Sequence, residues 1–305
     1  MIVRNLSEDW QIVDTAVILG NFDGVHKGHQ LLIARAREIA AAKGLQTSVL
    51  TFLPHPAKLL LGKDFRLIYT EEEKEAIFAA AGIENYILLP FTEKNKNMAP
   101  TEFIEEILLR RLGARAVIAG SDYRFGQKAA GDAGLLMEKL EPLAVRVTIL
   151  EKLQMQGEDV SSTRLRAAVM QGDLERFEDL TGRRFHLLGR VSTGRQLGRT
   201  IGFPTINVIP PAEKLLPPNG VYAAEVIYQG RCYRAVSNVG ISPSVPGKPY
   251  SVETYIFDFA DTIYGQPVEI RLLRYLRPEM TFASVEALKA QIQRDAAAVK
   301  NMSIL

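Results

Sequence analysis

Cysteine is almost missing from the sequence, since Cys232 is the single cysteine among 305 residues. One thiol excludes an internal disulfide and a cysteine-rich zinc site. This usage fits a protein of a reducing compartment, and we expect a cytoplasmic location.

An excess of charge of one sign is also missing. Lysine and arginine total 37, aspartate and glutamate total 35, and the formal net charge is +2. A balance this small does not indicate a broad nucleic-acid or membrane surface, so any anion site must be local. No apolar run approaches the length of a membrane span, and the N-terminal residues MIVRNLSEDW lack the layout of a secretion signal.

What is present is ordinary globular material. Hydrophobic residues make up 47% of the 305 residues and charged residues 24%, which is enough apolar surface for a sizeable core. A chain of this length is long for one hydrophobic core, so two domains are expected.

The first part of the chain alternates short apolar runs with helical patterns. The runs AVILG, TSVLTF, NYILLPF, RAVIAG and VRVTILE read as strands, with helices expected at 28–42, 71–81 and 101–113. This alternation predicts an α/β domain with a Rossmann-like parallel sheet covered by helices. Ligands of such folds bind at the carboxyl ends of the strands, and both GNFDGVHKGH and GSDYRFG directly follow predicted strands.

The character of the sequence changes after Arg183. A helical stretch, 161–182, closes the first part; beyond it, short alternating segments such as GVYAAEVIY and SVETYIFDF dominate. They predict a small antiparallel β-barrel, followed by one helix at about 284–300. We place the domains at 1–183 and 184–305.

The loop GNFDGVHKGH has the features of a phosphate cradle. Gly20, Gly24 and Gly28 permit tight turns, and the helix that follows presents unpaired N–H groups. His26 and His29 would lie on nearly the same side of the first helical turn, where each could donate an N–H to a phosphate oxygen. The spacing is not that of a Walker A loop and suits nucleotidyl transfer. Two surface histidines are the competing interpretation, and zinc lacks the third and fourth ligands it would need.

A second candidate site lies in the barrel half. Thr205 and Asn207 are two residues apart on an extended segment, so a hydroxyl and an amide would face the same way and could hold Mg²⁺. A simple Thr-Asn turn is the alternative. Glu253 alternates with Tyr255 and Phe257, which suits a general base in phosphoryl transfer. A solvent-facing glutamate is the alternative there, and Glu269 in PVEIRLL is the rival carboxylate, taken as solvent-facing.

Several motifs together resemble one family. GNFDGVHKGH, TFLPHP, RLIYTEEEK, GSDYRFG and VSSTRLR resemble, in order and spacing, the adenylyltransferase half of bacterial bifunctional riboflavin kinase/FAD synthetases. GRTIGFPTIN, NGVYA, SVETYIFDF and LRYLRPE resemble the riboflavin kinase half. Departures occur in RLIYT, in the Tyr of GSDYRFG, and at Ile241 and Ser244 of NVGISPSV, where the family usually has Arg and Thr.

The resemblance implies roles for individual residues. His26 and His29 contact ATP phosphates, and Asp122 lines the nucleotide and flavin side. Glu253 activates the riboflavin 5′-hydroxyl, and Thr205 and Asn207 hold Mg²⁺ and ATP phosphates. The remaining nucleotide-binding positions are Gly20, Asn21, Asp23, Gly24, Ser161, Ser162, Thr163 and Arg164.

The implied function has two steps: the barrel phosphorylates riboflavin to FMN with ATP, and the α/β domain adenylylates FMN to FAD, releasing pyrophosphate. Mg²⁺ is the implied cofactor; ATP, riboflavin and FMN are the substrates. One alternative is that only one activity is retained, with the other domain acting as a flavin-binding module. A nucleic-acid-binding or flavin-sensing barrel is another, but GRCYR (230–234) is its only basic and aromatic cluster. We therefore expect small-molecule substrates and no nucleic acid, and the sequence leaves the oligomeric state open.

Overall fold

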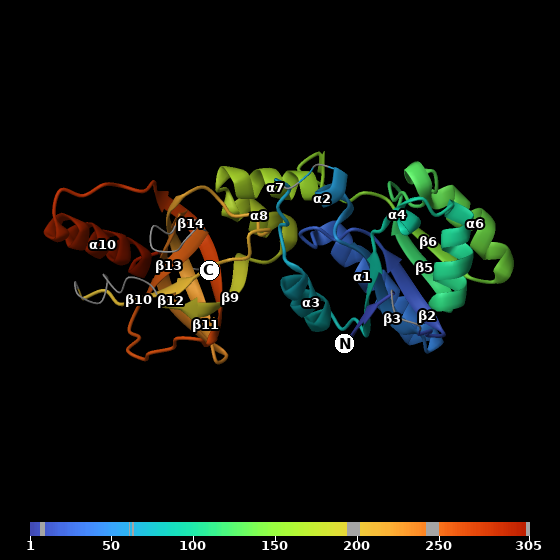
Figure 1. Cartoon of the computed structure of the whole chain (residues 1–305), viewed down its shortest axis with the longest axis horizontal. Coiled ribbons are helices and arrows are strands. Elements are labelled where there is room, and N and C mark those ends of the chain that lie inside the picture. The colour runs from blue at the N-terminus through green and yellow to red at the C-terminus, as the bar shows by residue number, and fades with distance from the viewer. Residues whose placement is uncertain (7–9, 61, 63, 194–201, 242–249, 303–305) are drawn as a thin grey trace. The chain divides into compact units, whose positions relative to one another are not determined.

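The computed structural model of the chain describes residues 1–6, 10–60, 62, 64–193, 202–241 and 250–302. It divides into two compact units, one made of residues 1–65 and 74–162 and the other of residues 66–73 and 163–305. Figure 1 labels the elements of both units.

The first unit is built on a parallel sheet of six strands in the order β1-β4-β3-β2-β5-β6. The strands are β1 (Ile2–Asn5), β2 (Thr15–Leu19), β3 (Gln46–Leu53), β4 (Asn85–Pro90), β5 (Ala114–Gly120) and β6 (Arg146–Leu150). Every residue of β2 is buried, which explains why its sequence is a continuous apolar run rather than an alternating one.

Helices accompany this sheet (Figure 1). They are α1 (Lys27–Lys43), α2 (Pro56–Leu60), α3 (Glu71–Ala80), α4 (Glu93–Lys96), α5 (Pro100–Glu102), the π-helix η1 (Phe103–Arg111), the 3₁₀ turns η2 (Gln127–Ala129) and η3 (Glu141–Leu143), and α6 (Ala133–Leu140). A two-stranded hairpin, β7 (Gln154–Met155) and β8 (Glu158–Asp159), follows β6. α1 buries Leu32, Ile33, Ala36, Ile39 and Ala40, and it ends at Gly44, whose φ of 66° is the left-handed conformation of a helix C-cap.

The stretch 161–182, expected to be helical, forms two helices, α7 (Ser162–Gln171) and α8 (Leu174–Thr181). The break has a local cause. Gly172 has a φ of 73°, which stops α7, and the side chain of Asp173 accepts a hydrogen bond from Arg176 N to begin α8.

The second unit contains a closed antiparallel barrel with the strand order β10-β13-β12-β11-β14-β9. Its strands are β9 (Phe185–Ser192), β10 (Thr205–Val208), β11 (Gly220–Tyr228), β12 (Arg231–Ile241), β13 (Tyr250–Ile256) and β14 (Pro267–Arg277), and α10 (Val285–Lys300) follows them. The predicted fold class, a Rossmann-like parallel sheet followed by a small barrel with a final helix, is confirmed.

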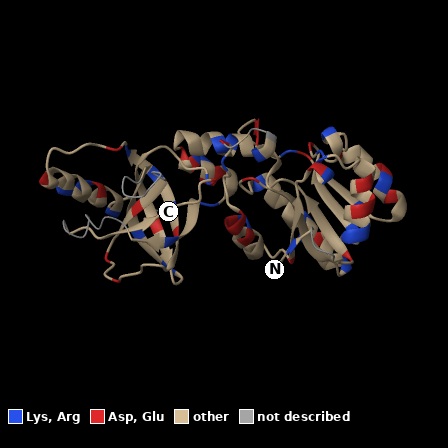
Figure 2. Ribbon diagram, in the orientation of Figure 1, with Lys and Arg blue, Asp and Glu red and all other residues tan. Residues whose placement is uncertain are grey.

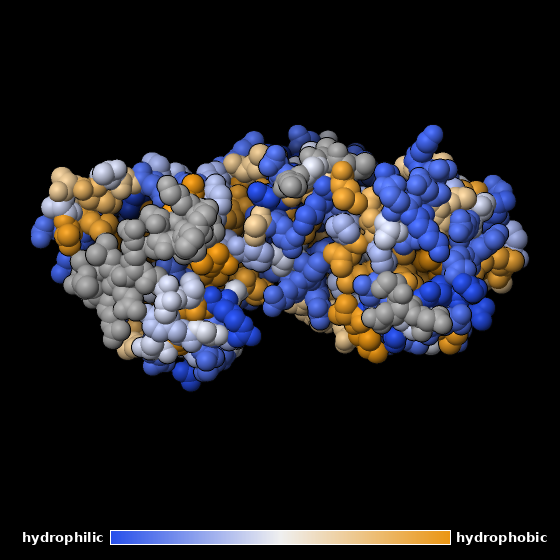
Figure 3. All heavy atoms as spheres, viewed as in Figure 1, coloured by the Kyte–Doolittle hydropathy of each residue, from blue (hydrophilic) through white to orange (hydrophobic). Residues whose placement is uncertain are grey.

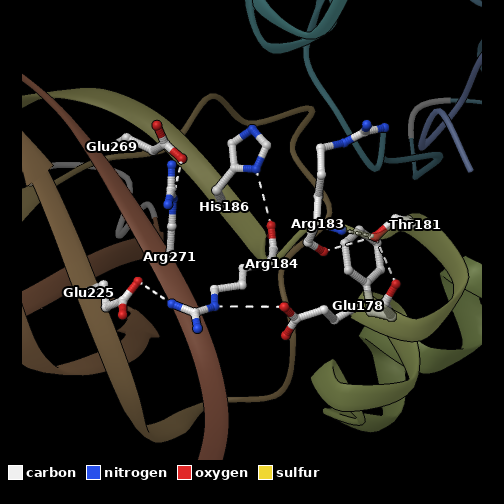
Figure 4. A network of polar contacts seen from close by, with 9 residues as sticks. Glu178, Thr181, Arg183, Arg184, His186, Glu225, Glu269 and Arg271 are labelled. Atoms are coloured by element: carbon white, nitrogen blue, oxygen red, sulfur yellow. Dashed lines mark hydrogen bonds and ion pairs between the residues drawn. The ribbon is translucent and has the colours of Figure 1, made fainter. Parts of the chain in front are cut away.

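Polar contacts join α8 to the barrel around the expected domain boundary. Arg184 contacts Glu225 of β11 through Nη1 and lies 3.7 Å through Nε from Glu178 Oε1 of α8 (Figure 4). Thr181 Oγ1 accepts a hydrogen bond from Arg183 N at 3.1 Å. The boundary at 183/184 stays a prediction, because the division into compact units falls earlier, within α7.

Charged residues of both signs are distributed over both units (Figure 2). On the face shown in Figure 3, hydrophobic residues form separate patches among hydrophilic ones. Exposed apolar side chains in scattered positions are normal for a folded protein. None of the helices in the described part of the chain is long and apolar enough to span a bilayer.

Candidate functional sites

The loop between β2 and α1 has an unusual backbone. Phe22, Gly24 and Val25 have φ values of 52°, 86° and 39°, all in the left-handed region. For the β-branched Val25 this conformation is a strained outlier, and such residues concentrate at functional sites. The loop therefore holds its side chains in an arrangement that ordinary turn residues would not favour.

His26 and His29 form one unit at the beginning of α1. His26 is the N-cap residue, and its Nδ1 accepts a hydrogen bond from His29 N at 3.3 Å. The two rings stack with their centroids 3.7 Å apart and their planes 18° from parallel. Because Nδ1 of His26 is an acceptor, the neutral ring carries its proton on Nε2, which is then free to donate.

The burial of these two rings lowers both pKa values. Burial is the main cause of the lowered pKa of His26, which falls to about 4 although the nearby Asp122 opposes the shift. Burial also holds the pKa of His29 well below its usual value, with a further lowering from His26. Both imidazoles are therefore neutral near pH 7, and each offers one N–H donor rather than a full positive charge.

Phe22 supports this pair from below, and the sequence analysis did not single it out. Its fully buried ring lies 5.0 Å from that of His29 and 5.5 Å from that of Phe78. A Cβ on Gly20 would come within 2.9 Å of the Phe22 ring. Gly20 is thus required by a close approach, in addition to its place in the loop.

A cavity of about 350 Å³ opens beside the histidines. The predicted residues that line it are Gly20, Asn21, His26, His29, Asp122, Ser161 and Ser162. Gly24 belongs to the same loop without lining the cavity, and so does Asp23, whose backbone oxygen accepts a hydrogen bond from Ser162 Oγ at 2.7 Å. This bond ties the loop to the first residue of α7.

Lys152 is a further cavity residue that the sequence analysis missed. Its Nζ lies 3.2 Å from Asp122 Oδ2 and 3.6 Å from Asp159 Oδ2, and it also lines the cavity. The hydrogen bond with Asp122 raises the pKa of Lys152. The first site therefore combines neutral donors with one paired cation.

Thr163 and Arg164 follow Ser162 in α7 but belong to the second compact unit. Arg166, also in VSSTRLR, was not among the predicted residues. Its Nη1 donates to the backbone oxygen of Arg66 at 2.6 Å, within the second unit. The signal that could have singled out Arg166 is its place three residues after Thr163, where the SSTxxR spacing puts the arginine.

In the barrel, three polar residues on adjacent strands lie in register. Glu253 of β13 is directly opposite Asn207 of β10 on one side and Asn238 of β12 on the other. Asn207 Nδ2 donates to Glu253 Oε1 at 3.3 Å. Asn207 Oδ1 is buried and has no hydrogen-bond partner among the residues that the structure describes.

Two cavities flank this row. One, of about 300 Å³, is lined by Thr205, Asn238 and Glu253 and by the apolar or aromatic side chains of Phe203, Tyr255, Met280, Phe282, Leu288 and Ile292. The other, of about 230 Å³, is lined by Thr205 and by residues that include Phe259 and Tyr264. Thr205 is shared by both, whereas Asn207 lines neither.

Two positions where the sequence departs from the expected motif differ in what can be said of them. Ile241 ends β12 and is 50% exposed. Ser244 lies outside the described residues, as do 198–201 of GRTIGFPTIN. Among the described residues, no group of three or more His, Cys, Asp or Glu side chains is placed to hold a metal ion.

The fold and the sites define a two-domain chain of the nucleotide-dependent transferase class, with a histidine-bearing phosphate loop in one domain and a carboxylate-centred barrel site in the other. Residues 9–164 match the family model of FAD synthetase, and residues 181–303 match that of riboflavin kinase. The chain belongs to the family of bifunctional riboflavin kinase/FMN adenylyltransferases, so the resemblance noted in the sequence is confirmed.

Similar proteins cover nearly the whole chain. A bifunctional riboflavin kinase/FMN adenylyltransferase of Listeria monocytogenes is 35% identical over 95% of this chain and 92% of that protein. The Escherichia coli K12 protein of the same name is 34% identical over 96% and 94%. A crystal structure titled as a macrolide-efflux protein from Streptococcus pneumoniae has a TM-score of 0.89 at 31% identity, covering 99% of this chain and all of that one.

Proposed function

We propose that the barrel transfers the γ-phosphate of ATP to riboflavin and that the α/β unit transfers AMP from a second ATP to the FMN formed. Support comes above all from one coincidence. Each of the two family matches spans a separate cavity, and each cavity is lined by side chains suited to the corresponding step. The macrolide-efflux title of the similar structure has no counterpart in these sites.

In the kinase step, the riboflavin 5′-oxygen attacks the γ-phosphorus, and the bond from that phosphorus to the β,γ-bridging oxygen breaks. Glu253 accepts the hydroxyl proton, and ADP leaves. The hydrogen bond from Asn207 Nδ2 orients the Glu253 carboxylate for this task. The mixed aromatic and apolar lining of the 300 Å³ cavity suits a flavin ring.

Thr205 and Asn207 are the residues that would hold Mg²⁺. The buried Asn207 Oδ1 without a partner is the kind of oxygen that a hard cation takes as a ligand. Bound Mg²⁺ supplies neutralisation of phosphate charge during the transfer. Thr205 lies at the wall shared by the two barrel cavities, as expected of a residue between the donor nucleotide and the acceptor flavin.

In the adenylyl step, a phosphate oxygen of FMN attacks the α-phosphorus of ATP, and pyrophosphate leaves. The attacking oxygen carries no proton to remove, so no general base is needed. His26 and His29 act as neutral N–H donors to phosphate oxygens whose charge grows in the transition state. Asn21, Asp122, Ser161 and Ser162 line the same cavity and take part in binding the substrates.

Two substitutions and a chromatographic time course with riboflavin, ATP and Mg²⁺ test the proposal. The wild-type chain should produce FMN first and FAD afterwards. His29→Ala should lower FAD formation by roughly 100-fold or more and leave FMN formation unchanged. Glu253→Ala should lower FMN formation by roughly 100- to 10,000-fold and leave the conversion of supplied FMN unchanged.

Glu269→Gln is the matched control for Glu253→Ala, because Glu269 is paired with Arg271 at 2.6 Å and does not line either barrel cavity (Figure 4). It should retain both activities. Loss of both activities in either active-site variant would contradict separate sites. FMN without FAD in the wild type, or FAD only from supplied FMN, would show that one activity alone is retained.

We also propose that the partners are small molecules and that the chain works in the cytoplasm. The absence of a nucleic-acid partner stays a prediction. A gel shift with RNA at low salt checks it, since a basic surface would bind most tightly there.

A further inference from the structure

A second carboxylate stands at the end of the polar row in the kinase site. The row runs across the barrel from Asn207 through Glu253 to Asn238, whose Nδ2 donates to Glu279 Oε1 at 3.1 Å. Glu279 and Asn238 both line the 300 Å³ cavity that Glu253 lines. Directly opposed residues on antiparallel strands have Cβ atoms about 5 Å apart, so each residue of the row is one side chain's reach from the next.

The barrel leaves room for this carboxylate. A Cβ on Gly240 would collide with Glu279 Oε1, so the Glu279 carboxylate lies directly against the backbone of β12. Gly240 thus allows a close approach that any other residue would block. A plain solvent-facing glutamate would need neither this space nor the bond from Asn238.

The segment that carries Glu279 is anchored two residues earlier. Arg277 donates from Nε to both Asp295 oxygens at 3.1 Å and from Nη2 to Oδ2 at 2.7 Å. Asp295 belongs to α10 and is 7% exposed, and Gln291 also donates to it at 2.8 Å. A bidentate pair of this kind fixes direction as well as distance. Glu279 is therefore held in place before any substrate arrives.

We infer that Asn238 and Glu279 bind the ribityl chain of riboflavin and determine the preference of the kinase site for a polyol. The inference rests on the proposed function. In the row, the proposed Mg²⁺ ligand Asn207 lies on one side of Glu253, and Asn238 and Glu279 lie on the other. If the phosphoryl donor occupies the first side and the 5′-hydroxyl lies at Glu253, the remaining hydroxyls of the acceptor fall on the second side.

The chemistry of this pair suits the polyol. Chain hydroxyls are donors that need acceptors, and a carboxylate offers several lone pairs for them. The ring of the flavin is served instead by the aromatic and apolar walls of the cavity, such as Phe203 and Tyr255. Glu279 therefore contributes to recognition of the chain rather than of the ring.

The test compares riboflavin with lumiflavin, which has the same ring system without the polyol. The KM for riboflavin and the inhibition constant of lumiflavin in the kinase reaction are measured for the wild type, Glu279→Gln and Glu279→Ala. Glu279→Ala should raise the KM for riboflavin about 10- to 100-fold, and Glu279→Gln about 3- to 10-fold, since a neutral acceptor remains. The lumiflavin constant and kcat at saturating riboflavin should change less than about twofold.

Glu175→Gln is the control, because it removes an exposed carboxylate of the same unit that pairs with Arg274 of β14. It should leave both constants unchanged. A parallel rise of the riboflavin KM and the lumiflavin constant would show that Glu279 only shapes the cavity, and an unchanged KM in Glu279→Ala would equally overturn the inference. Absence of riboflavin phosphorylation in the wild type would instead count against the proposed function itself.

Discussion

Replacing Lys214 with methionine removes the positive charge of a fully buried ion pair in the second unit. The Lys214 side chain is 0% exposed and that of Glu73 1% exposed, with Nζ 2.6 Å from Oε2. Nζ also donates to the backbone oxygens of Ile68 and His186, both at 2.8 Å. The contact fixes the segment 66–73 against the start of the barrel.

The size of the effect follows from what the substitution leaves behind. Two backbone oxygens lose their donor, and the Glu73 carboxylate loses its cation, although it still accepts from Thr70 N at 2.8 Å and Leu188 N at 3.1 Å. Removing one partner of a buried pair costs about 3–5 kcal/mol. Because two donors to the carboxylate remain, we expect a loss near the lower end, about 3 kcal/mol. This corresponds to a Tm lower by roughly 6–12 °C for a domain of about 150–250 residues.

Urea and thermal unfolding of the full chain, followed by the loss of kinase activity, measure this loss. Lys289→Met is the control, since Lys289 is an exposed lysine of α10, and it should change the free energy of unfolding by less than about 0.5 kcal/mol. The double variant Glu73→Gln/Lys214→Met should lose less than the sum of the single losses, because the unpaired charge is gone. A loss below about 1 kcal/mol for Lys214→Met would refute the reasoning.

The two sites give further predictions. The pKa of His26 is lowered to about 4 in the folded chain, so between pH 6.5 and 4 the unfolded chain binds a proton that the folded chain does not. Stability from this group is therefore complete above pH 6.5 and falls by about 3 kcal/mol toward pH 4; urea unfolding should show a flatter pH dependence in His26→Gln, and an unchanged slope would contradict the assignment. Asn207→Ala should raise the Mg²⁺ concentration for half-maximal FMN formation about tenfold and leave FAD formation from FMN unchanged; a Mg²⁺ titration that matches the wild type would remove Asn207 as a ligand.

Local pattern was sufficient to predict the fold class. Val17 and Ile18 are completely buried in the middle of the parallel sheet, so their strand had to be an apolar run, which is visible in the sequence without any partner. The same holds for α10, which begins at the expected Ser284, whose side chain accepts from Ala287 N. The helix break at Gly172 was missed because an isolated glycine in a helical pattern does not reveal its φ value.

Long-range pairing is what the pattern could not provide. RLIYTEEEK reads as part of the first domain, yet its residues 66–73 belong to the second compact unit, where Glu73 meets Lys214 across 141 positions of sequence. A lysine in PAEKLL is expected at the surface, because burial of an ammonium is unfavourable without a partner. Neither residue carries a local signal that names the other.

The kinase site shows the same limit more sharply. Glu253 and Asn207 were found because each lies in a motif, but their contact and the addition of Asn238 depend on the strand order β10-β13-β12. A predicted barrel without a strand order contains all three residues and no row. Once the order is known, the register places Asn238 opposite Glu253, and the close approach at Gly240 then brings in Glu279. Specificity in this site therefore depends on neighbours that are defined only after the barrel closes.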